Sequence, residues 1–225
     1  MYKGPISYSG KSLFFECPAR WADAYIHGNR GPQGKAAERG NQLHDALEQF
    51  FLEPEGMYPR EVVTNRGREY VLAGWEGFMR GLLPYSPIPE CELAVDENWR
   101  PTQFNDPLAY ARGKADLRYA DDTFLYIYDW KSGRMYDSHV KQGEMYVAMS
   151  PEGHEQYVAR FVYLDQAPTT MEWRYTPADR RTIIIKLIDE IETIRNAHEY
   201  PETPNANCKW CHLSWRNGGG CTKAP

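Results

Sequence analysis

The sequence predicts an α/β fold in which a mixed central sheet is flanked by helices. The first observation is the order of the predicted elements, which runs helices, three strands, a helix, two strands and a final helix. The second is the composition, because 42% hydrophobic and 14% aromatic residues are typical of a globular chain. The third is the length of 225 residues. A chain of that size can bury about 70% of its unfolded surface, which is enough for a full core.

The N-terminal part, about residues 1–85, is expected to be helical. Apolar residues recur at near-helical spacing over 9–26, where Pro18 marks the first turn of a second short helix. Residues 35–51 form an amphipathic pattern, with His44 beside the apolar face. A third helix is predicted over 66–83, with Tyr70 and Trp75 among its buried residues.

The middle of the chain changes from helical spacing to the alternation of strands. Strands are predicted where β-branched and aromatic residues alternate with polar ones, over 92–99, 108–119, 123–130, 156–164 and 171–175. The turn 120–122 joins two of these into a β-hairpin, and 138–149 returns to helical spacing. A long helix begins at Pro177, with Thr176 as its N-cap. We therefore expect a core over 1–200 and a separate cysteine-bearing segment over 201–225.

Charge and cysteine content exclude several classes of protein. The 26 basic and 31 acidic residues give a net charge of −5, which excludes a histone-like or polybasic-tail mode of nucleic-acid binding. The sequence has no apolar run long enough for a membrane span and no secretion signal, so we expect a soluble cytoplasmic protein without a membrane partner. Five cysteines do not suit a disulfide framework in that compartment, which leaves metal ligation or free thiols.

The predicted hairpin carries the sharpest group of polar residues. Antiparallel pairing across its short turn can bring Asp116 and Asp129 to the same end of the sheet. Two carboxylates repel unless a cation lies between them, and such oxygen ligands select Mg²⁺ or Mn²⁺. Lys131 would point to the same face as Asp129 and could orient a water or stabilise phosphorane charge. These groups suit metal-assisted phosphodiester hydrolysis, although a surface salt pair is the simpler alternative.

Four motifs in order resemble the PD-(D/E)XK nuclease superfamily, specifically its RecB-like branch. Gly40-Asn41-Gln42-Leu43-His44 resembles the G-x-x-x-H motif, and Gly113-Lys114-Ala115-Asp116 resembles the G-x-x-D motif. Asp129-Trp130-Lys131 and Gln142-Gly143-Glu144-Met145-Tyr146 resemble the (D/E)-x-K and Q-x-x-x-Y motifs. The resemblance spans nearly the whole chain and implies a restriction-endonuclease-like fold.

The resemblance also implies a role for each motif residue. The metal ligands would be His44, Asp116, Asp129 and the carbonyl of Trp130, with the imidazole favouring Mn²⁺. Taken alone, a histidine such as His44 on an apolar-faced helix is more often an ordinary, partly buried residue than a metal ligand. Gln142 and Tyr146 lie on one helical face and would orient DNA, while Lys131 would position the attacking water. Glu92 resembles an auxiliary acid of the superfamily or is an exposed strand-end glutamate.

Four cysteines form a second pattern. Cys17 lies near the N-terminus, and Cys208, Cys211 and Cys221 lie near the C-terminus. This spacing resembles the iron-sulfur subset of RecB-like nucleases, which includes the AddB nuclease domain, CRISPR-associated adaptation nucleases and phage exonucleases. The resemblance implies a [4Fe-4S] cluster that joins the chain ends, with Zn²⁺ as the alternative. The long interval from Cys211 to Cys221 departs from the pattern, and His212 competes as a ligand.

The combined expectation is a metal-dependent DNA nuclease. The cofactors would be Mg²⁺ or Mn²⁺ and the cluster, and the substrate would be single-stranded or frayed DNA processed from an end. Two alternatives are a structure-specific or restriction-type endonuclease and a catalytically silent DNA-binding module of a recombination complex. Recombination or CRISPR adaptation proteins would be partners, in a bacterial, archaeal or phage-infected cell. The tail has a local charge of +3 and two tryptophans, Trp210 and Trp215, which suits either strand holding or packing around the metal.

Overall fold

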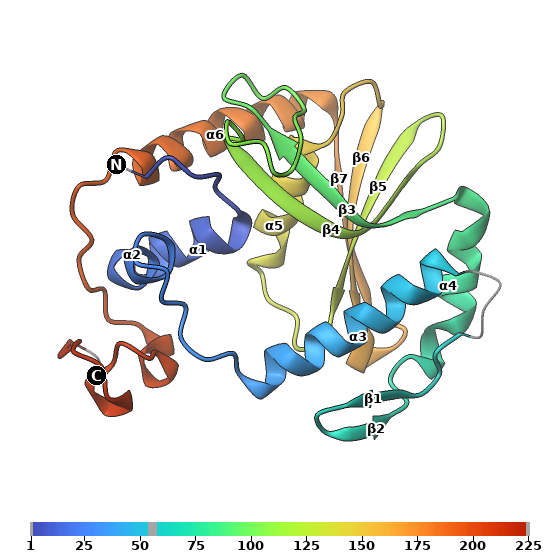
Figure 1. The fold of residues 1–225 in the computed structure, drawn as a ribbon. Helices are drawn as coiled ribbons and strands as arrows, with labels where there is room; N and C mark the ends of the chain where they lie inside the picture. The colour runs from blue at the N-terminus through green and yellow to red at the C-terminus, as the bar shows by residue number, and fades with distance from the viewer. Residues whose placement is uncertain (1, 54–57, 224–225) are drawn as a thin grey trace.

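A five-stranded mixed sheet forms the centre of the protein (Figure 1). The structure is a computed structural model that describes residues 2–53 and 58–223. The strands are adjacent in chain order, and β5 and β6 are parallel while every other neighbouring pair is antiparallel. They are β3 (Ile88–Val95), β4 (Ala111–Ala120), β5 (Phe124–Lys131), β6 (Gln156–Tyr163) and β7 (Thr170–Tyr175). The predicted α/β class with a mixed sheet is confirmed.

Helices cover both faces of the sheet and bury one core on each (Figure 1). One face packs against α1 (Tyr8–Glu16), α2 (Pro18–Tyr25), α5 (His139–Met149) and α6 (Pro177–Arg195). The other face packs against α3 (Lys35–Leu52) and α4 (Glu76–Leu82). Strand alternation produces this division, because Leu125 and Ile127 of β5 enter the first core while Tyr128 and Trp130 enter the second. No helix within the described ranges is both long and apolar enough to cross a membrane.

The third predicted helix is wrong over its first half. Residues Val62–Thr64 (β1) and Gly67–Glu69 (β2) form a small antiparallel hairpin, and helical structure begins only at Ala73. Gly67 at the hairpin turn has a φ of 99°, a left-handed conformation that ends any helix there. Tyr70 is consequently 61% exposed, whereas Trp75 is buried as expected.

Two strand boundaries also differ from the prediction. The first strand of the sheet begins at Ile88 and ends at Val95, and the second begins at Ala111. The residues between them form an irregular connection that contains Pro101 and Pro107, and proline cannot donate the backbone bond that a ladder needs. Alternation alone predicts that both strands extend into this connection.

A buried arginine on α3 joins three parts of the second core. Arg39 is 3% exposed, and its guanidinium binds Glu69 of β2 (2.8 Å) and Asp165 (3.0 Å), which follows β6. It also donates to the carbonyl of Ser132 (3.1 Å), just beyond the end of β5. These carboxylates raise the pKa of Arg39 above its ordinary value. A buried charge is tolerated only when it is paired, so the hairpin, α3 and the end of β5 are fixed together.

We expect Arg39→Ala to lower the free energy of unfolding by about 3 kcal/mol, because it leaves two carboxylates without their partner. Urea unfolding followed by circular dichroism measures the change. Arg68→Ala is the matched control, since Arg68 pairs with Glu61 but its side chain is 73% exposed, and it should cost under about 0.5 kcal/mol. Equal effects of the two substitutions would contradict the bracing role of Arg39.

Candidate functional site

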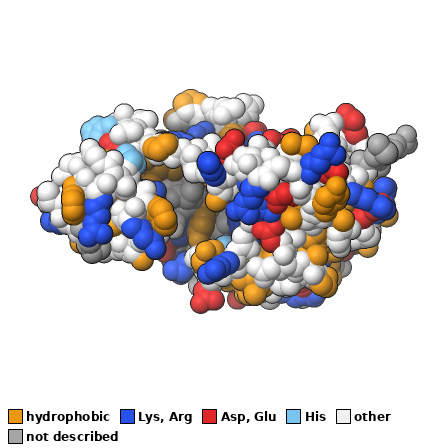
Figure 2. All heavy atoms as spheres, turned by 90° about the horizontal axis from the view of Figure 1, so that it is seen from below, with side chains coloured by type: hydrophobic (Ala, Val, Ile, Leu, Met, Phe, Trp, Pro, Cys, Tyr) orange, Lys and Arg blue, Asp and Glu red, His pale blue; other side chains and the backbone are white. Residues whose placement is uncertain are grey.

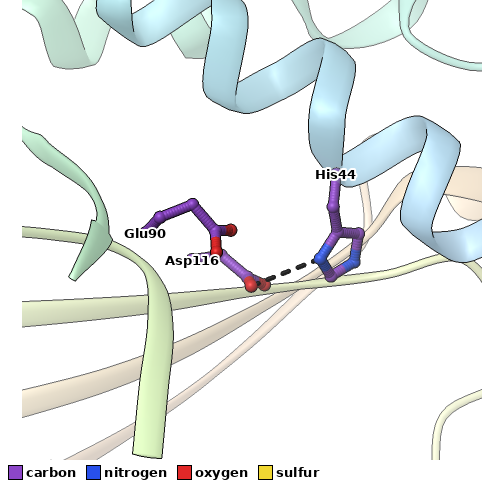
Figure 3. A group of neighbouring side chains, drawn as sticks. All are labelled: His44, Glu90 and Asp116. Atoms are coloured by element: carbon purple, nitrogen blue, oxygen red, sulfur yellow. Dashed lines mark ion pairs between the residues drawn. The ribbon is translucent and has the colours of Figure 1, made fainter. Parts of the chain in front are cut away.

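Three side chains from three elements converge at one edge of the sheet (Figure 3). His44 comes from α3, Glu90 from β3 and Asp116 from β4, and one potential ligand atom of each lies within 4.8 Å of the others. The Nδ1 atom of His44 is 3.3 Å from Oδ1 of Asp116. Two carboxylates and an imidazole form a donor set that suits a divalent cation such as Mn²⁺ or Mg²⁺.

Close packing of α3 against the end of β5 positions His44. Leu43 and Leu47 are fully buried, which directs the neighbouring imidazole to the sheet edge. One turn before His44, a Cβ on Gly40 would lie 3.2 Å from Oγ of Ser132, so a larger residue there would require a shift of a few tenths of an ångström. The other ring nitrogen of His44, Nε2, is 2.8 Å from the carbonyl oxygen of Trp130. The glycine of the G-x-x-x-H motif therefore permits the contact that the histidine makes.

Glu90 is the site residue that the sequence did not reveal. The pairing of Pro89 with Leu117 and of Cys91 with Ala115 places Glu90 opposite Asp116. Glu90 has a φ of 46°, in the left-handed region that strand residues rarely occupy. Both strands are irregular at this point, since Ala115 enters one core and Leu117 the other although they are two residues apart.

Glu92, which the sequence suggested as an auxiliary acid, lies elsewhere. It is exposed, pairs in register with Lys114 and lines a shallow surface depression with residues 102–105. Residues two apart on a regular strand share a face, so alternation would have grouped Glu90 with Glu92. The left-handed backbone at Glu90 directs its side chain away from that of Glu92. No sequence pattern predicts that conformation.

A second group of side chains surrounds Asp129 on the α5 side of β5. Gln142 donates from Nε2 to Oδ2 of Asp129 (2.7 Å) and accepts at Oε1 from Nζ of Lys131 (3.0 Å). Lys131 also forms an ion pair with Asp129. Tyr146 accepts from Nε2 of Gln142 (2.8 Å) and donates to the carbonyl of Lys114 (2.9 Å). The predicted residues of the third and fourth motifs thus form one connected network.

Trp130 joins the two groups through its backbone. Its N–H donates to Oδ2 of Asp116 (2.6 Å), and its carbonyl faces His44. The predicted set is therefore divided, with His44, Asp116 and the Trp130 carbonyl on one side and the Asp129 network on the other. Both groups lie at the end of β5, beyond the last paired residues of β4 and β5, Leu117 and Tyr128.

The electrostatics of the site favour an added positive charge. Burial lowers the pKa of His44, because it disfavours the charged imidazolium. The negative charges of Asp116 and Asp129 outweigh the effect of burial and raise the His44 pKa to about 9. Burial raises the pKa of Asp129 although Lys131 opposes the shift. Burial and the nearby Asp116 also raise the pKa of Glu90. A proton on His44 partly offsets this concentration of carboxylates, and a bound divalent cation would offset it more fully.

Glycines at two motif positions allow α5 to approach the sheet. A Cβ on Gly143 would meet Cβ of Ala159 at 2.8 Å, inside any normal contact. A Cβ on Gly113 would lie 2.9 Å from Cε of Met149 and 3.2 Å from Cε1 of Tyr146. The first glycine lies within the Q-x-x-x-Y segment and the second begins the G-x-x-D segment. Gly143 is therefore required for this close approach of α5, whereas a larger residue at Gly113 would mainly displace the flexible end of Met149.

The four cysteines of the second pattern line one cavity. It has about 340 Å³ of empty space, part of it open to solvent, and its lining includes Cys17, Cys208, Cys211 and Cys221. Cys17 lies at the joint between α1 and α2, and backbone hydrogen bonding there holds the tail, since the amide of Ala19 donates to the carbonyl of Pro201 (3.2 Å). His212 lies 2.7 Å from Asp23 through Nε2 and Oδ2. The fifth cysteine, Cys91, is buried in the first core.

Known proteins share both the sequence pattern and the fold. The profile of the PD-(D/E)XK nuclease superfamily matches residues 5–216. A structure from Eubacterium rectale, named "Putative exonuclease", is 14% identical with a TM-score of 0.57, covering 99% of this chain and 91% of its own. The structure named SSO0001 is 15% identical with a TM-score of 0.47, covering 96% of this chain and 86% of its own. A search of curated proteins gives no significant match. With nearly its whole length matched by the superfamily profile, this chain belongs to the PD-(D/E)XK nuclease superfamily.

Proposed function

We propose that this nuclease is a metal-dependent deoxyribonuclease that processes single-stranded or frayed DNA from an end. The observation that carries the proposal is the meeting of His44 and Asp116 with the Asp129 and Lys131 network at the end of β5. That meeting supplies cation ligands beside a lysine, which is the combination that phosphodiester hydrolysis requires. The name of the Eubacterium rectale structure supports an exonuclease over an endonuclease.

We assign the cation to His44, Asp116, Asp129 and the carbonyl of Trp130, with Glu90 close enough to contribute. A bound Mg²⁺ or Mn²⁺ would polarise the phosphate and lower the pKa of a bound water. Lys131 would hold the attacking water or balance charge on the phosphate, because its ammonium already lies between Asp129 and Gln142. Gln142 and Tyr146 would orient the strand through the same network.

We also propose that Cys17, Cys208, Cys211 and Cys221 hold a [4Fe-4S] cluster. Their presence around one cavity supports this ligand set, and thiolates suit iron-sulfur clusters or Zn²⁺. The cluster would connect a nuclease core over 1–200 with the segment 201–225 and would be structural. A reducing cytoplasm keeps such thiols available, and recombination or CRISPR adaptation proteins would be the partners there.

Asp116→Asn and Asp129→Asn should each reduce DNA cleavage by about a thousandfold or more, because each removes a charged ligand of a hard cation. End-labelled single-stranded and double-stranded DNA, digested with Mg²⁺ or Mn²⁺, provides the assay. Asp122→Asn is the control, since Asp122 is exposed in the turn between β4 and β5. Full activity of Asp116→Asn, in protein free of contaminating nuclease, would refute the site.

Gln142→Ala and Tyr146→Phe should each lower turnover or DNA affinity by about tenfold to a hundredfold, while Mn²⁺ affinity stays near that of the unaltered protein. The reason is that both residues hold Asp129 and the substrate but are not assigned to the cation. Calorimetry measures Mn²⁺ binding, and cleavage kinetics measure turnover. Lys141→Ala, an exposed position on the same helix, is the control. Unchanged kinetics in both variants would mean that α5 only packs against the sheet.

Protein purified without oxygen should be brown and contain about four irons per chain, because four thiolates satisfy one cubane cluster. Cys17→Ser and Cys208→Ser should lose most of this iron. Cys91→Ser should retain it, since Cys91 is buried within the first core. Colourless protein with stoichiometric zinc would reject the cluster and leave the nuclease proposal standing.

A further inference from the structure

Two tryptophans of the C-terminal segment are exposed to solvent. Trp210 is 76% exposed and Trp215 is 55% exposed, whereas Trp21, Trp75 and Trp130 are almost fully buried. Exposed apolar side chains that lie close together, unlike single ones, mark interaction sites. More than half of each of these two side chains is exposed, so packing within the protein accounts for only part of either ring.

Each exposed ring carries its own cation. The Lys209 ammonium lies 5.4 Å from the centroid of the Trp210 ring, and the Arg216 guanidinium lies 5.4 Å from that of Trp215. Neither cation forms an ion pair with a carboxylate of the described residues. The segment 205–225 contains three basic residues and no acidic one, in a chain whose net charge is −5. The tail surface is therefore positive while the whole protein is negative.

Hydrogen bonds hold the two aromatic turns in a fixed relation. Trp210 ends the 3-10 turn Ala206–Trp210 and Trp215 begins the turn Trp215–Asn217. The Asn217 side chain donates to the carbonyls of Lys209 (3.1 Å) and Cys211 (2.9 Å), which links the turns directly. The two rings are thus presented on one ordered unit, and ligand binding would not have to order them first.

This unit lies beside a hollow in the molecular surface. Figure 2 shows the hollow between the lobe that contains the C-terminal segment and the part that contains α3, with basic side chains on both sides. Figure 1 places the C-terminal segment near the start of α3, the helix that carries His44. The hollow therefore lies between the tail surface and the part of the molecule that carries α3.

We propose that Trp210 and Trp215, with Lys209 and Arg216, form a stacking platform for single-stranded DNA outside the active site. The inference rests on the proposed function for its substrate and adds where the strand is held. Bases stack on exposed aromatic rings without sequence preference, and adjacent cations meet the phosphates between them. A duplex hides the faces of its bases from such rings, so the platform selects unpaired strands.

The direct test is binding of a fluorescein-labelled 20-mer of deoxythymidine to the full chain in an Asp116→Asn background. Trp210→Ala and Trp215→Ala should each weaken binding about fivefold to a hundredfold, as expected for loss of one stacked base. Lys209→Ala and Arg216→Ala should each reduce the slope of log affinity against log salt by about 0.7. Tyr85→Ala is the matched control, because Tyr85 is 50% exposed after α4 and should leave affinity unchanged.

Two further measurements separate binding from folding and from chemistry. Trp210→Tyr and Trp215→Tyr should restore most of the affinity, because tyrosine also stacks, and this excludes a purely structural loss. In the active protein, the alanine variants should hydrolyse bis(p-nitrophenyl) phosphate at the wild-type rate, since this substrate is too small to reach the platform. Their KM for long single strands should rise while kcat changes less than twofold.

Wild-type affinity of both tryptophan variants for the 20-mer would overturn the platform, even if the protein cleaves DNA normally. Loss of binding in these variants, from a protein that never cleaves DNA, would support the platform and refute the proposed function. Equal loss for single strands and blunt duplexes would overturn the assignment of an unpaired strand. A copurifying protein displaced by both substitutions, with DNA affinity unchanged, would make the surface a protein interface instead.

Discussion

The Asp116 carboxylate is the point at which the site is assembled. One oxygen lies 3.3 Å from His44 Nδ1 on α3, and the other accepts the amide hydrogen of Trp130 on β5 at 2.6 Å. Glu90 of β3 stands opposite Asp116 across the strand pair. Strands β3, β4 and β5 therefore meet helix α3 at the Asp116 side chain. Helix α3 lies on the opposite face of the sheet from α5. Any shift of α3 or of the end of β5 would change the distances from this carboxylate to His44 or to the Trp130 amide.

Burial of charge explains why the surrounding residues are so closely specified. Asp129 is 3% exposed, and an ionised carboxylate in that position needs partners. Lys131, Gln142 and Tyr146 supply them, and the small contacts at Gly113 and Gly143 let α5 come near enough. Arg39 on α3 is likewise a buried charge with charged partners, and its contacts join the segment after β5 to the β1–β2 hairpin. The polar network and the glycines thus serve one requirement, which is that the buried Asp129 carboxylate must have hydrogen-bonding and charged partners.

Sequence reasoning succeeded where local pattern decides the structure. Strand alternation and helical spacing indicated the order of elements along the chain and a mixed sheet, and they placed the four motifs on the correct helices and strands. Sequence reasoning failed where the backbone conformation of a single residue decides the local structure. The left-handed Glu90 brings an unpredicted acid to the site, and the left-handed Gly67 replaces half of a predicted helix with a hairpin. Contacts between distant segments, such as Arg39 with Asp165, have no signature in local periodicity.

The central claim is that a divalent cation binds at the Asp116 cluster. A crystal structure of the protein soaked in Mn²⁺, with anomalous diffraction measured at the manganese edge, tests it most directly. We expect an anomalous peak within about 2.0–2.3 Å of an Asp116 oxygen and a His44 nitrogen. Retention of the direct contact between His44 and Asp116 at saturating Mn²⁺, with no peak between them, would contradict it.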